Sequence, residues 1–419
     1  MNDIYYRRYL PTDAEKIISE KFNWLIEYVK KTPQLDFQIT FNCDKKGNGE
    51  NAIIPDLGKG SSRFSLYRGT SRILSFEFSN KCKLKISAAE SYKANCSPSD
   101  NFFSPEGLSL KNISVYLENI NNFIDEKGNK KYGRYYINKD GKVEGFFQNL
   151  LNRRYTLFPK DDDDFIIFDR EFEFGFSSKI QEDSQNREAS KCISDLRNKA
   201  IKDNVLFNNT YLEKSGFDEI DGIGINKNGD IIIMEVKHPR NDEGIAYGPM
   251  QVRYYIEQLK KALNNKSFNA EFLDSITKIV EQKQRLGILT LPSKWEMPKQ
   301  LSGKIIPYLI VGSMDDKPFL SKPMKKRFDG VRKYFNDDKF PLQVKVCANT
   351  AEYDGTLMDY TIEWPSPSIE ESTRLADAIS VMHPPFEIIC KNIWLIENKF
   401  VPLHRQTGFF VGNGFLLLR

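Results

Sequence analysis

The chain has 419 residues, of which 40% are hydrophobic and 28% charged, and its formal net charge at pH 7 is +4. A chain of this length can bury a large core in two or three domains, and so small a net charge means that any basic surface must be local. Three histidines and six scattered cysteines without a CxxC pair argue against histidine-rich metal centres, zinc ribbons and four-cysteine iron–sulfur sites.

The amino-terminal segment lacks the apolar region of a signal peptide. No apolar run reaches the roughly 18 residues that a membrane span needs. We therefore expect a cytoplasmic protein with reduced cysteines and without a membrane partner.

The N-terminal part of the chain predicts a helix followed by sheet. Thr12 and Glu15 form a capping-box pattern that opens an apolar helical periodicity. From about 34 to 120, short runs of alternating apolar and polar residues, separated by Gly, Asn, Ser and Lys clusters, predict antiparallel strands. A helix at 144–155 and a half-buried strand at 169–176 complete this part.

The following part predicts an α/β unit built on a mixed sheet. Asn228-Gly229 joins two strand-like segments and is a strong hairpin signal. Pro249 is expected at the first position of a helix. In chain order we expect a helix at 186–203, strands at 204–212, 218–226 and 230–238, helices at 249–263 and 271–285, a strand at 305–313 and a basic helix at 322–335.

The fold class predicted from this order is α/β, or α+β over the whole chain. We place a domain boundary in the polar stretch 178–186. The expected domains are a β-rich α+β domain at 1–180, an α/β core at 181–340 and an accessory α+β region at 341–419 that ends in an apolar hairpin.

Charged residues occur where an apolar strand of the predicted core ends. Glu235 and Lys237 follow the run Ile-Ile-Ile-Met and, being two residues apart on a strand, point to the same face. The hairpin can bring Asp221 beside Glu235. Two converging carboxylates suit a hard cation such as Mg²⁺ or Mn²⁺, to which the carbonyl of Val236 can add an oxygen ligand. A lysine beside this ion can hold a water and offset charge on a phosphoryl group.

These residues resemble the signature of the PD-(D/E)XK nuclease superfamily, an acidic residue on one strand and (D/E)-x-K on the next. Asp221 matches the first acid and Glu235 to Lys237 the second element, whereas Ile220 stands where the name has proline. The resemblance covers roughly 186–340. It implies a restriction-endonuclease-like core, in which helices flank a mixed central sheet, and it implies that Lys237 positions the attacking water.

A further motif and two further carboxylates extend the resemblance. Gln251 and Tyr255 match the Q-x-x-x-Y motif of the RecB-like branch and share one helical face. Gln251 is expected in the first turn of its helix, where the N-terminus favours phosphate. The first helix of this superfamily often supplies another metal ligand, for which Glu188 is the best match and Glu144 the second candidate.

The resulting interpretation is a metal-dependent nuclease that hydrolyses DNA, with endonuclease action favoured. Bacterial antiphage defence or restriction is implied by the resemblance alone, and the N-terminal domain is expected to select the substrate or to sense a partner. Basic segments, among them 152–155, offer surfaces for a phosphate backbone.

Several alternatives stay open. The substrate can be RNA, or the enzyme can be a sequence-specific restriction enzyme whose N-terminal domain reads bases. The chain can also be a non-cleaving nucleic-acid-binding or assembly module, in which Glu235 and Lys237 form a structural ion pair. A homodimer and an activating partner protein are compatible with each of these interpretations.

Overall fold

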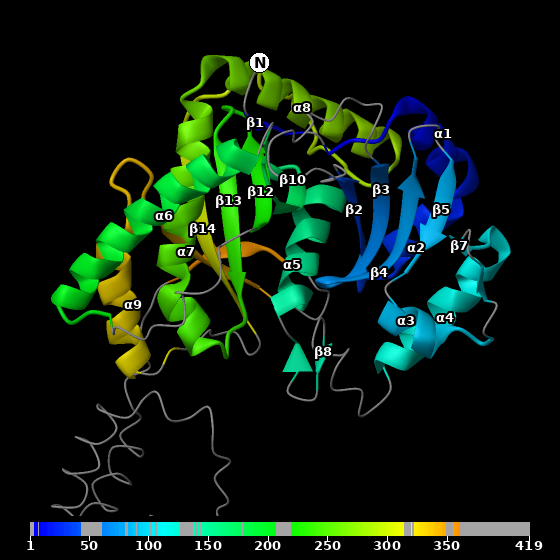
Figure 1. Cartoon of the computed structure of the whole chain (residues 1–419), viewed down its shortest axis with the longest axis horizontal. Coiled ribbons are helices and arrows are strands. Elements are labelled where there is room, and N and C mark those ends of the chain that lie inside the picture. The colour runs from blue at the N-terminus through cyan, green and yellow to red at the C-terminus, as the bar shows by residue number, and fades with distance from the viewer. Residues whose placement is uncertain are drawn as a thin grey trace, which may run out of the picture. The chain divides into compact units, whose positions relative to one another are not determined.

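The computed structural model describes the parts of the chain that carry both predicted sheets. The described residues are 4–6, 8–42, 61–79, 83–88, 90–99, 102–104, 107–125, 137–138, 141–142, 144–176, 179–206, 219–313, 320, 322–348 and 355–360. They belong to one compact unit, which combines two six-stranded mixed sheets with helices in an α+β architecture (Figure 1). No helix in these ranges has the length and apolar character needed to cross a membrane.

The N-terminal sheet has the strand order β2-β3-β4-β5-β7-β6. Its first four strands pair antiparallel, as predicted, whereas β5 and β7 pair parallel. Alternate apolar residues of these strands form a core with the helices that flank them. The bounds are β2 (Leu35–Asn42), β3 (Ser61–Arg68), β4 (Ser71–Phe78), β5 (Leu84–Ser87), β6 (Phe103–Ser104), β7 (Gly107–Leu108), α1 (Thr12–Lys21), α2 (Asn23–Lys31), α3 (Glu90–Cys96), the short 3₁₀ helix Leu110–Asn112 and α4 (Ile113–Asp125).

The second sheet has the order β10-β12-β13-β14-β15-β16 and carries the candidate site. The predicted hairpin is confirmed: β12 and β13 pair antiparallel, and Gly229 takes the positive φ of 79° that the connecting turn requires. The strands β13, β14 and β15 run parallel. The bounds are β10 (Phe165–Phe172), β12 (Ile220–Asn226), β13 (Ile231–Lys237), β14 (Ile305–Gly312), β15 (Gln343–Cys347) and β16 (Leu357–Asp359).

Helices cover both faces of the second sheet (Figure 1). α5 (Glu144–Asn152) and the short π-helix that follows it pack on one face, where Phe146 and Phe147 join alternate residues of β13 in a core. α7 (Asp242–Leu263) lies on β13 and β14, with α6 (Lys179–Lys202) and α9 (Lys322–Phe335) packed against it.

One further helix and two strand pairs complete the described structure. α8 (Lys266–Arg285) contacts β10, and Leu286 and Ile288 just after it belong to the core of the N-terminal sheet. This helix therefore links the two sheets. The short strands β1 (Ile4–Tyr5) and β11 (Gly175–Phe176) pair with each other, as do β8 (Ile137–Asn138) and β9 (Gly141–Lys142).

Several elements differ from the sequence-based expectations. A strand was expected at 204–212, but residues 204–206, the described part of it, form a turn. The neighbour of β12 in the sheet is instead β10. Residues 179–186 of the polar stretch 178–186 form the start of α6, so the stretch is not a break between elements there. β15 and β16, from the predicted accessory region, extend the second sheet. Residues 361–419, with the expected C-terminal hairpin, lie outside the described residues.

Candidate active site

The β12–β13 hairpin brings Asp221 next to the segment that contains Glu235 and Lys237. Gly222 lies opposite Met234 in the antiparallel register. The carboxylate of Asp221 accepts a hydrogen bond at its Oδ2 from the backbone N–H of Val236, at 2.7 Å. The pairing predicted from the sequence is therefore present, and Val236 contributes its N–H to it.

Glu235 and Lys237 are buried at the end of β13. Their exposed fractions are 1% and 9%. Met234 and Val236, which alternate with them along β13, pack with α5. Glu235 and Lys237 therefore project toward the opposite face, on which α7 lies. The ammonium of Lys237 donates to Oε1 of Glu235. Oε2 of Glu235 is also buried, and Tyr255 on α7 lies close enough to hydrogen-bond to the Glu235 carboxyl.

The electrostatics of this site favour the neutral carboxyl forms. Burial raises the pKa of Glu235 to about 7; the charge of Lys237 opposes this rise and that of Glu144 adds to it. Burial also raises the pKa of Asp221 well above its ordinary value, and the charges of Glu235 and Glu144 raise it further. The site thus holds more negative charge than its one lysine can offset.

Lys237 stays charged in this environment. Burial alone would lower the pKa of its ammonium, but the charges of Glu235, Glu144 and Asp221 raise it above the ordinary value for lysine. This side chain is therefore a fixed positive charge and hydrogen-bond donor, and not a base.

The additional carboxylate at the site comes from α5 and not from α6. Glu144 begins α5, and its charge acts on Asp221, Glu235 and Lys237. Glu188, the better sequence match, lies exposed on α6 and forms an ion pair with Lys261 at 2.8 Å. The structure does not bring Glu188 to Asp221 and Glu235. Sequence reasoning selected the helix nearer in the chain, because pairing of β10 with β12 across α6 is not visible in the local pattern.

Gln251 and Tyr255 lie behind the site on α7. The amide nitrogen of Gln251 donates to the hydroxyl of Tyr255 at 2.9 Å, and this hydroxyl donates to the carbonyl of Glu219 at 2.6 Å. Glu219 directly precedes β12. Burial raises the pKa of Tyr255, and the charges of Glu235 and Asp221 raise it further. The Q-x-x-x-Y pair thus anchors the start of the strand that carries Asp221.

The start of α7 differs from the prediction. The side chain of Asn241 accepts a hydrogen bond from the backbone N–H of Gly244, and acidic residues follow in the first turn. The helix therefore begins at Asp242, and Pro249 lies inside it. The expected place of Gln251 in the first turn is wrong, and with it the phosphate contact at the helix N-terminus.

Gln148 was not predicted as a site residue. It lies on α5 among apolar side chains, and its amide nitrogen donates to Oδ1 of Asp221 at 2.7 Å. A single buried amide on a helix that also carries Asn149 and Asn152 is a weak sequence signal, because its partner becomes known only from the fold. Both oxygens of Asp221 thus accept N–H donors.

The segment 152–155 is not a basic surface. Arg153 and Arg154 are both buried. The guanidinium of Arg153 donates to backbone carbonyls of the N-terminal part, among them that of Val29 at 2.9 Å, and Arg154 pairs with Asp163. These arginines therefore hold parts of the fold together.

The donor chemistry of the site fits a hard divalent cation. In the described part of the chain no group of three or more His, Cys, Asp or Glu side chains is arranged to hold a metal. Mg²⁺, however, is often bound by one or two carboxylates while it keeps several waters. The buried Oε2 of Glu235 and the raised pKa values of the two strand carboxyls match a site completed by positive charge.

No family model, curated protein or solved structure matches this chain. Its chemistry is therefore inferred from its own residues.

Proposed function

We propose that Asp221, Glu235 and Lys237 form the active site of a Mg²⁺- or Mn²⁺-dependent nuclease that hydrolyses DNA. The observation that carries this proposal is the buried meeting of an acid on one strand with an acid-x-lysine on the next, where negative charge is in excess. Endonuclease action and a place in bacterial antiphage defence or restriction are parts of the proposal that the resemblance to PD-(D/E)XK nucleases supports.

The order of elements around the site supports a restriction-endonuclease-like core. The superfamily core is a helix, three strands, a helix and a strand. Here α5, β10, β12, β13, α7 and β14 follow one another in this order, with β11 and α6 inserted between β10 and β12 and with α8 inserted between α7 and β14. Glu144 on α5 then takes the first-helix position, in place of Glu188.

Each residue has a definite task in the proposed reaction. The carboxylates of Asp221 and Glu235, with the carbonyl of Val236, would hold the cation, and Glu144 lies near enough to add to its field. When bound, a divalent cation polarises the phosphoryl group and lowers the pKa of water. Lys237, which stays protonated, donates hydrogen bonds to the attacking water and stabilises negative charge that develops on the phosphoryl oxygens.

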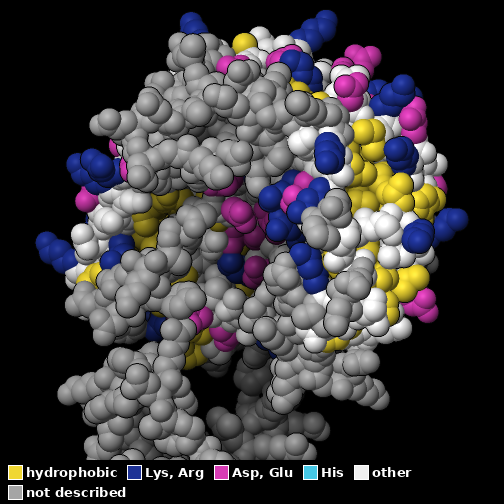
Figure 2. All heavy atoms as spheres, turned by 45° about the vertical axis from the view of Figure 1, so that its right-hand side comes forward, with side chains coloured by type: hydrophobic (Ala, Val, Ile, Leu, Met, Phe, Trp, Pro, Cys, Tyr) yellow, Lys and Arg dark blue, Asp and Glu magenta, His cyan; other side chains and the backbone are white. Residues whose placement is uncertain are grey.

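Acidic and basic side chains lie side by side on one face of the molecule. Figure 2 shows Asp and Glu side chains in a hollow near the middle of one face, with Lys and Arg side chains beside them. A local group of basic side chains can attract a phosphate backbone although the whole chain has a net charge of only +4.

Cleavage assays with the full chain test the proposal. Supercoiled plasmid, linear duplex and RNA are incubated with Mg²⁺, Mn²⁺ or EDTA, with wild type, Glu235→Gln and Lys237→Met. We expect metal-dependent nicking of the plasmid that falls about 100-fold or more in both variants. Glu188→Gln, the same change at an exposed carboxylate, is expected to cleave as wild type does. Cleavage in EDTA, or unchanged cleavage in both variants, would contradict the proposal.

A non-cleaving nucleic-acid-binding module is the second candidate. It is favoured by the hydrogen bonds that the site residues already make with one another: Lys237 donates to Glu235, and both oxygens of Asp221 accept hydrogen bonds. This candidate predicts binding of DNA or RNA without turnover and with no effect of Lys237→Met. Cleavage of RNA alone would retain the fold and the metal chemistry but change the substrate.

A further inference from the structure

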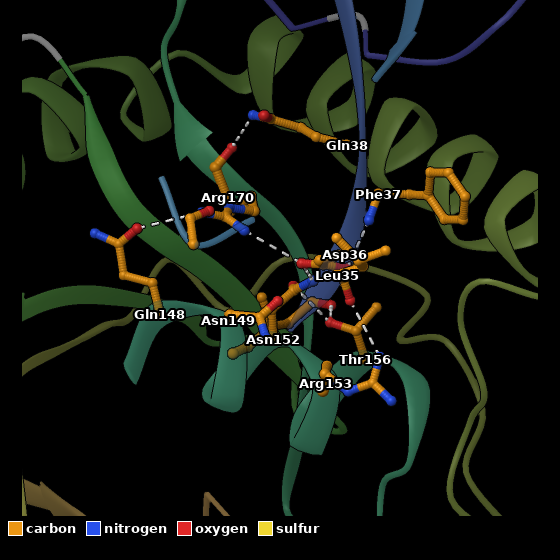
Figure 3. Close-up of polar contacts among 12 residues, drawn as sticks. Leu35, Asp36, Phe37, Gln38, Gln148, Asn149, Asn152, Arg153, Thr156 and Arg170 are labelled. Carbon is orange, nitrogen blue, oxygen red and sulfur yellow. Dashed lines mark hydrogen bonds and ion pairs between the residues drawn. The ribbon is translucent and has the colours of Figure 1, made fainter. Parts of the chain in front are cut away.

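Gln148 connects the candidate site to a second buried charge. Its side chain is 6% exposed. Its amide nitrogen donates to Oδ1 of Asp221 at 2.7 Å, while its amide oxygen accepts from Nη2 of Arg170 at 3.3 Å. Figure 3 shows this side chain reaching toward Arg170 from α5. One amide thus bridges a carboxylate of the site and an arginine of β10.

The chemistry of the two neighbours fixes the orientation of this amide. A guanidinium can only donate hydrogen bonds, so only the amide oxygen of Gln148 can face Arg170. The amide nitrogen must then face Asp221. Because the N–H of Val236 holds the other oxygen of Asp221, this carboxylate is restrained at both ends.

Arg170 is in turn held by the N-terminal sheet. Its Nη1 lies 3.3 Å from Oδ2 of Asp36 on β2, and its Nη2 donates to the carbonyl of Gly69 at 2.7 Å. The guanidinium also lies over the ring of Tyr67, with 5.3 Å to the ring centroid. Asn152 donates to the same oxygen of Asp36 (Figure 3). Arg170 therefore has one supported position, set mainly by residues of the N-terminal sheet.

We propose that Gln148 is a positioning residue for Asp221, and that Arg170 and Asp36 orient it, so that the N-terminal sheet completes the metal site of the core. This inference rests on the proposed function. Loss of a residue that hydrogen-bonds to a metal ligand commonly lowers the metal affinity by about 10- to 100-fold. Loss of either link should free the Asp221 carboxylate to turn and should weaken metal binding.

Titration of the full chain with Mn²⁺ alone, followed by calorimetry, tests this chain of contacts. Gln148→Met keeps the length and packing of the side chain but removes both hydrogen bonds, and Arg170→Lys keeps the charge but not the planar fork. We expect the Kd for Mn²⁺ to rise about 10-fold in each. In the double variant the Kd should rise no more than it does in the single variant with the larger rise, because both changes interrupt the same chain of contacts. The Gln148→Met result stands alone if Arg170→Lys does not fold.

Arg153→Lys is the matched control. Arg153 is also a buried arginine that ties the core to the N-terminal part, but its partners are the carbonyls of Val29, Lys30, Thr32 and Leu35. It should lower Tm and leave the Kd for Mn²⁺ unchanged. The inference would be overturned by any of three results: an unchanged Kd for Mn²⁺ in Gln148→Met, additive rises of the Kd in the double variant, or a rise of the Kd in Arg153→Lys as large as that in Gln148→Met.

The same titration separates this inference from the proposed function. If wild type does not bind Mn²⁺, or if Asp221→Asn binds as wild type does, the proposed metal site is wrong and the positioning role falls with it. If binding depends on Asp221 but not on Gln148, only the positioning role is wrong.

Discussion

Two clusters of buried charges lie within this fold, and they are balanced differently. The joint cluster connects the two sheets, and the site cluster lies where β12 begins and β13 ends. The joint cluster consists of Arg8, Asp36, Asp169, Arg170 and Lys283; the site cluster consists of Glu144, Asp221, Glu235 and Lys237.

In the joint cluster each carboxylate has a cationic partner. Asp36 pairs with Arg170 at 3.3 Å, and Asp169 pairs with Arg8 at 3.4 Å and lies 4.0 Å from Lys283. The hydroxyl of Tyr6 also donates to Asp169, at 2.6 Å. Buried charges that are paired and hydrogen-bonded in this way make the relative position of two elements specific.

In the site cluster three carboxylates share one ammonium. Burial raises the pKa values of Asp221 and Glu235, and the charge of Glu144 adds to both rises. Excess charge of this kind reduces stability in the absence of a ligand. Both clusters contain buried charges, so burial of charge alone does not identify a functional site. In the site cluster the carboxylates outnumber the cations, and a bound divalent cation would relieve that excess.

The largest stability effect is expected in the joint cluster. Asp169→Asn keeps the shape of a side chain that is 1% exposed but leaves Arg8 and Lys283 without their carboxylate. We expect the free energy of unfolding to fall by about 3 kcal/mol or more, because breaking one side of a buried ion pair leaves the other charge unsatisfied. Urea denaturation measures this loss, with the exposed Asp195→Asn as the matched control. If the loss is as small as that of the control, the ion pairs of Asp169 do not stabilise the fold, and the proposed difference between the clusters is wrong.

The opposite sign is expected for a carboxylate of the site cluster in metal-free protein. The carboxyl of Glu235 ionises near pH 4.5 when unfolded and at about 7 when folded. Its contribution to stability is therefore full below pH 4.5 and is lost as the pH rises through 7. Relative to wild type, Glu235→Gln should gain about 3 kcal/mol between pH 4.5 and 8.

Urea denaturation of Glu235→Gln and wild type in EDTA at pH 5, 6, 7 and 8 measures this gain. Mg²⁺ should reverse it, by stabilising wild type alone at pH 8. A difference between the two proteins that does not change with pH would mean that Glu235 is as well compensated as Asp169.

A smaller effect is expected behind the site. Tyr255→Phe removes the hydroxyl that donates to the carbonyl of Glu219 and accepts from Gln251. The free energy of unfolding should fall by about 1 kcal/mol, with only a modest loss of cleavage. The measurement is urea denaturation together with the plasmid assay. Loss of cleavage without loss of stability would place this hydroxyl in the chemistry itself.

The sequence predicts local features of this protein better than long-range ones. The Asn-Gly hairpin and the spacing from Asp221 to Lys237 lie within one short segment, so the pattern alone places these residues together. The start of α7 was misplaced because proline at a first helical position is a strong signal, yet the cap at Asn241 determines the start.

Long-range pairing explains the rest of the difference. β10 reaches its place beside β12 across the whole of α6, so the sequence pattern favours α6 and Glu188, whereas the charge of Glu144 on α5 acts on the site. The link from Gln148 through Arg170 to Asp36 joins residues more than a hundred positions apart in sequence. No local periodicity encodes such a contact.

The same substitution made in both clusters tests most sharply whether the site cluster carries the nuclease activity. Lys237 and Lys283 are both buried, and Lys283 donates to the carbonyl of Phe168 at 2.6 Å. Plasmid cleavage in Mg²⁺ is measured for Lys237→Met and Lys283→Met at a temperature at which both are folded by circular dichroism. We expect Lys237→Met to lose about 100-fold or more in cleavage rate, and Lys283→Met to cleave as wild type does. Equal activity in the two variants, whether retained or lost, would contradict it.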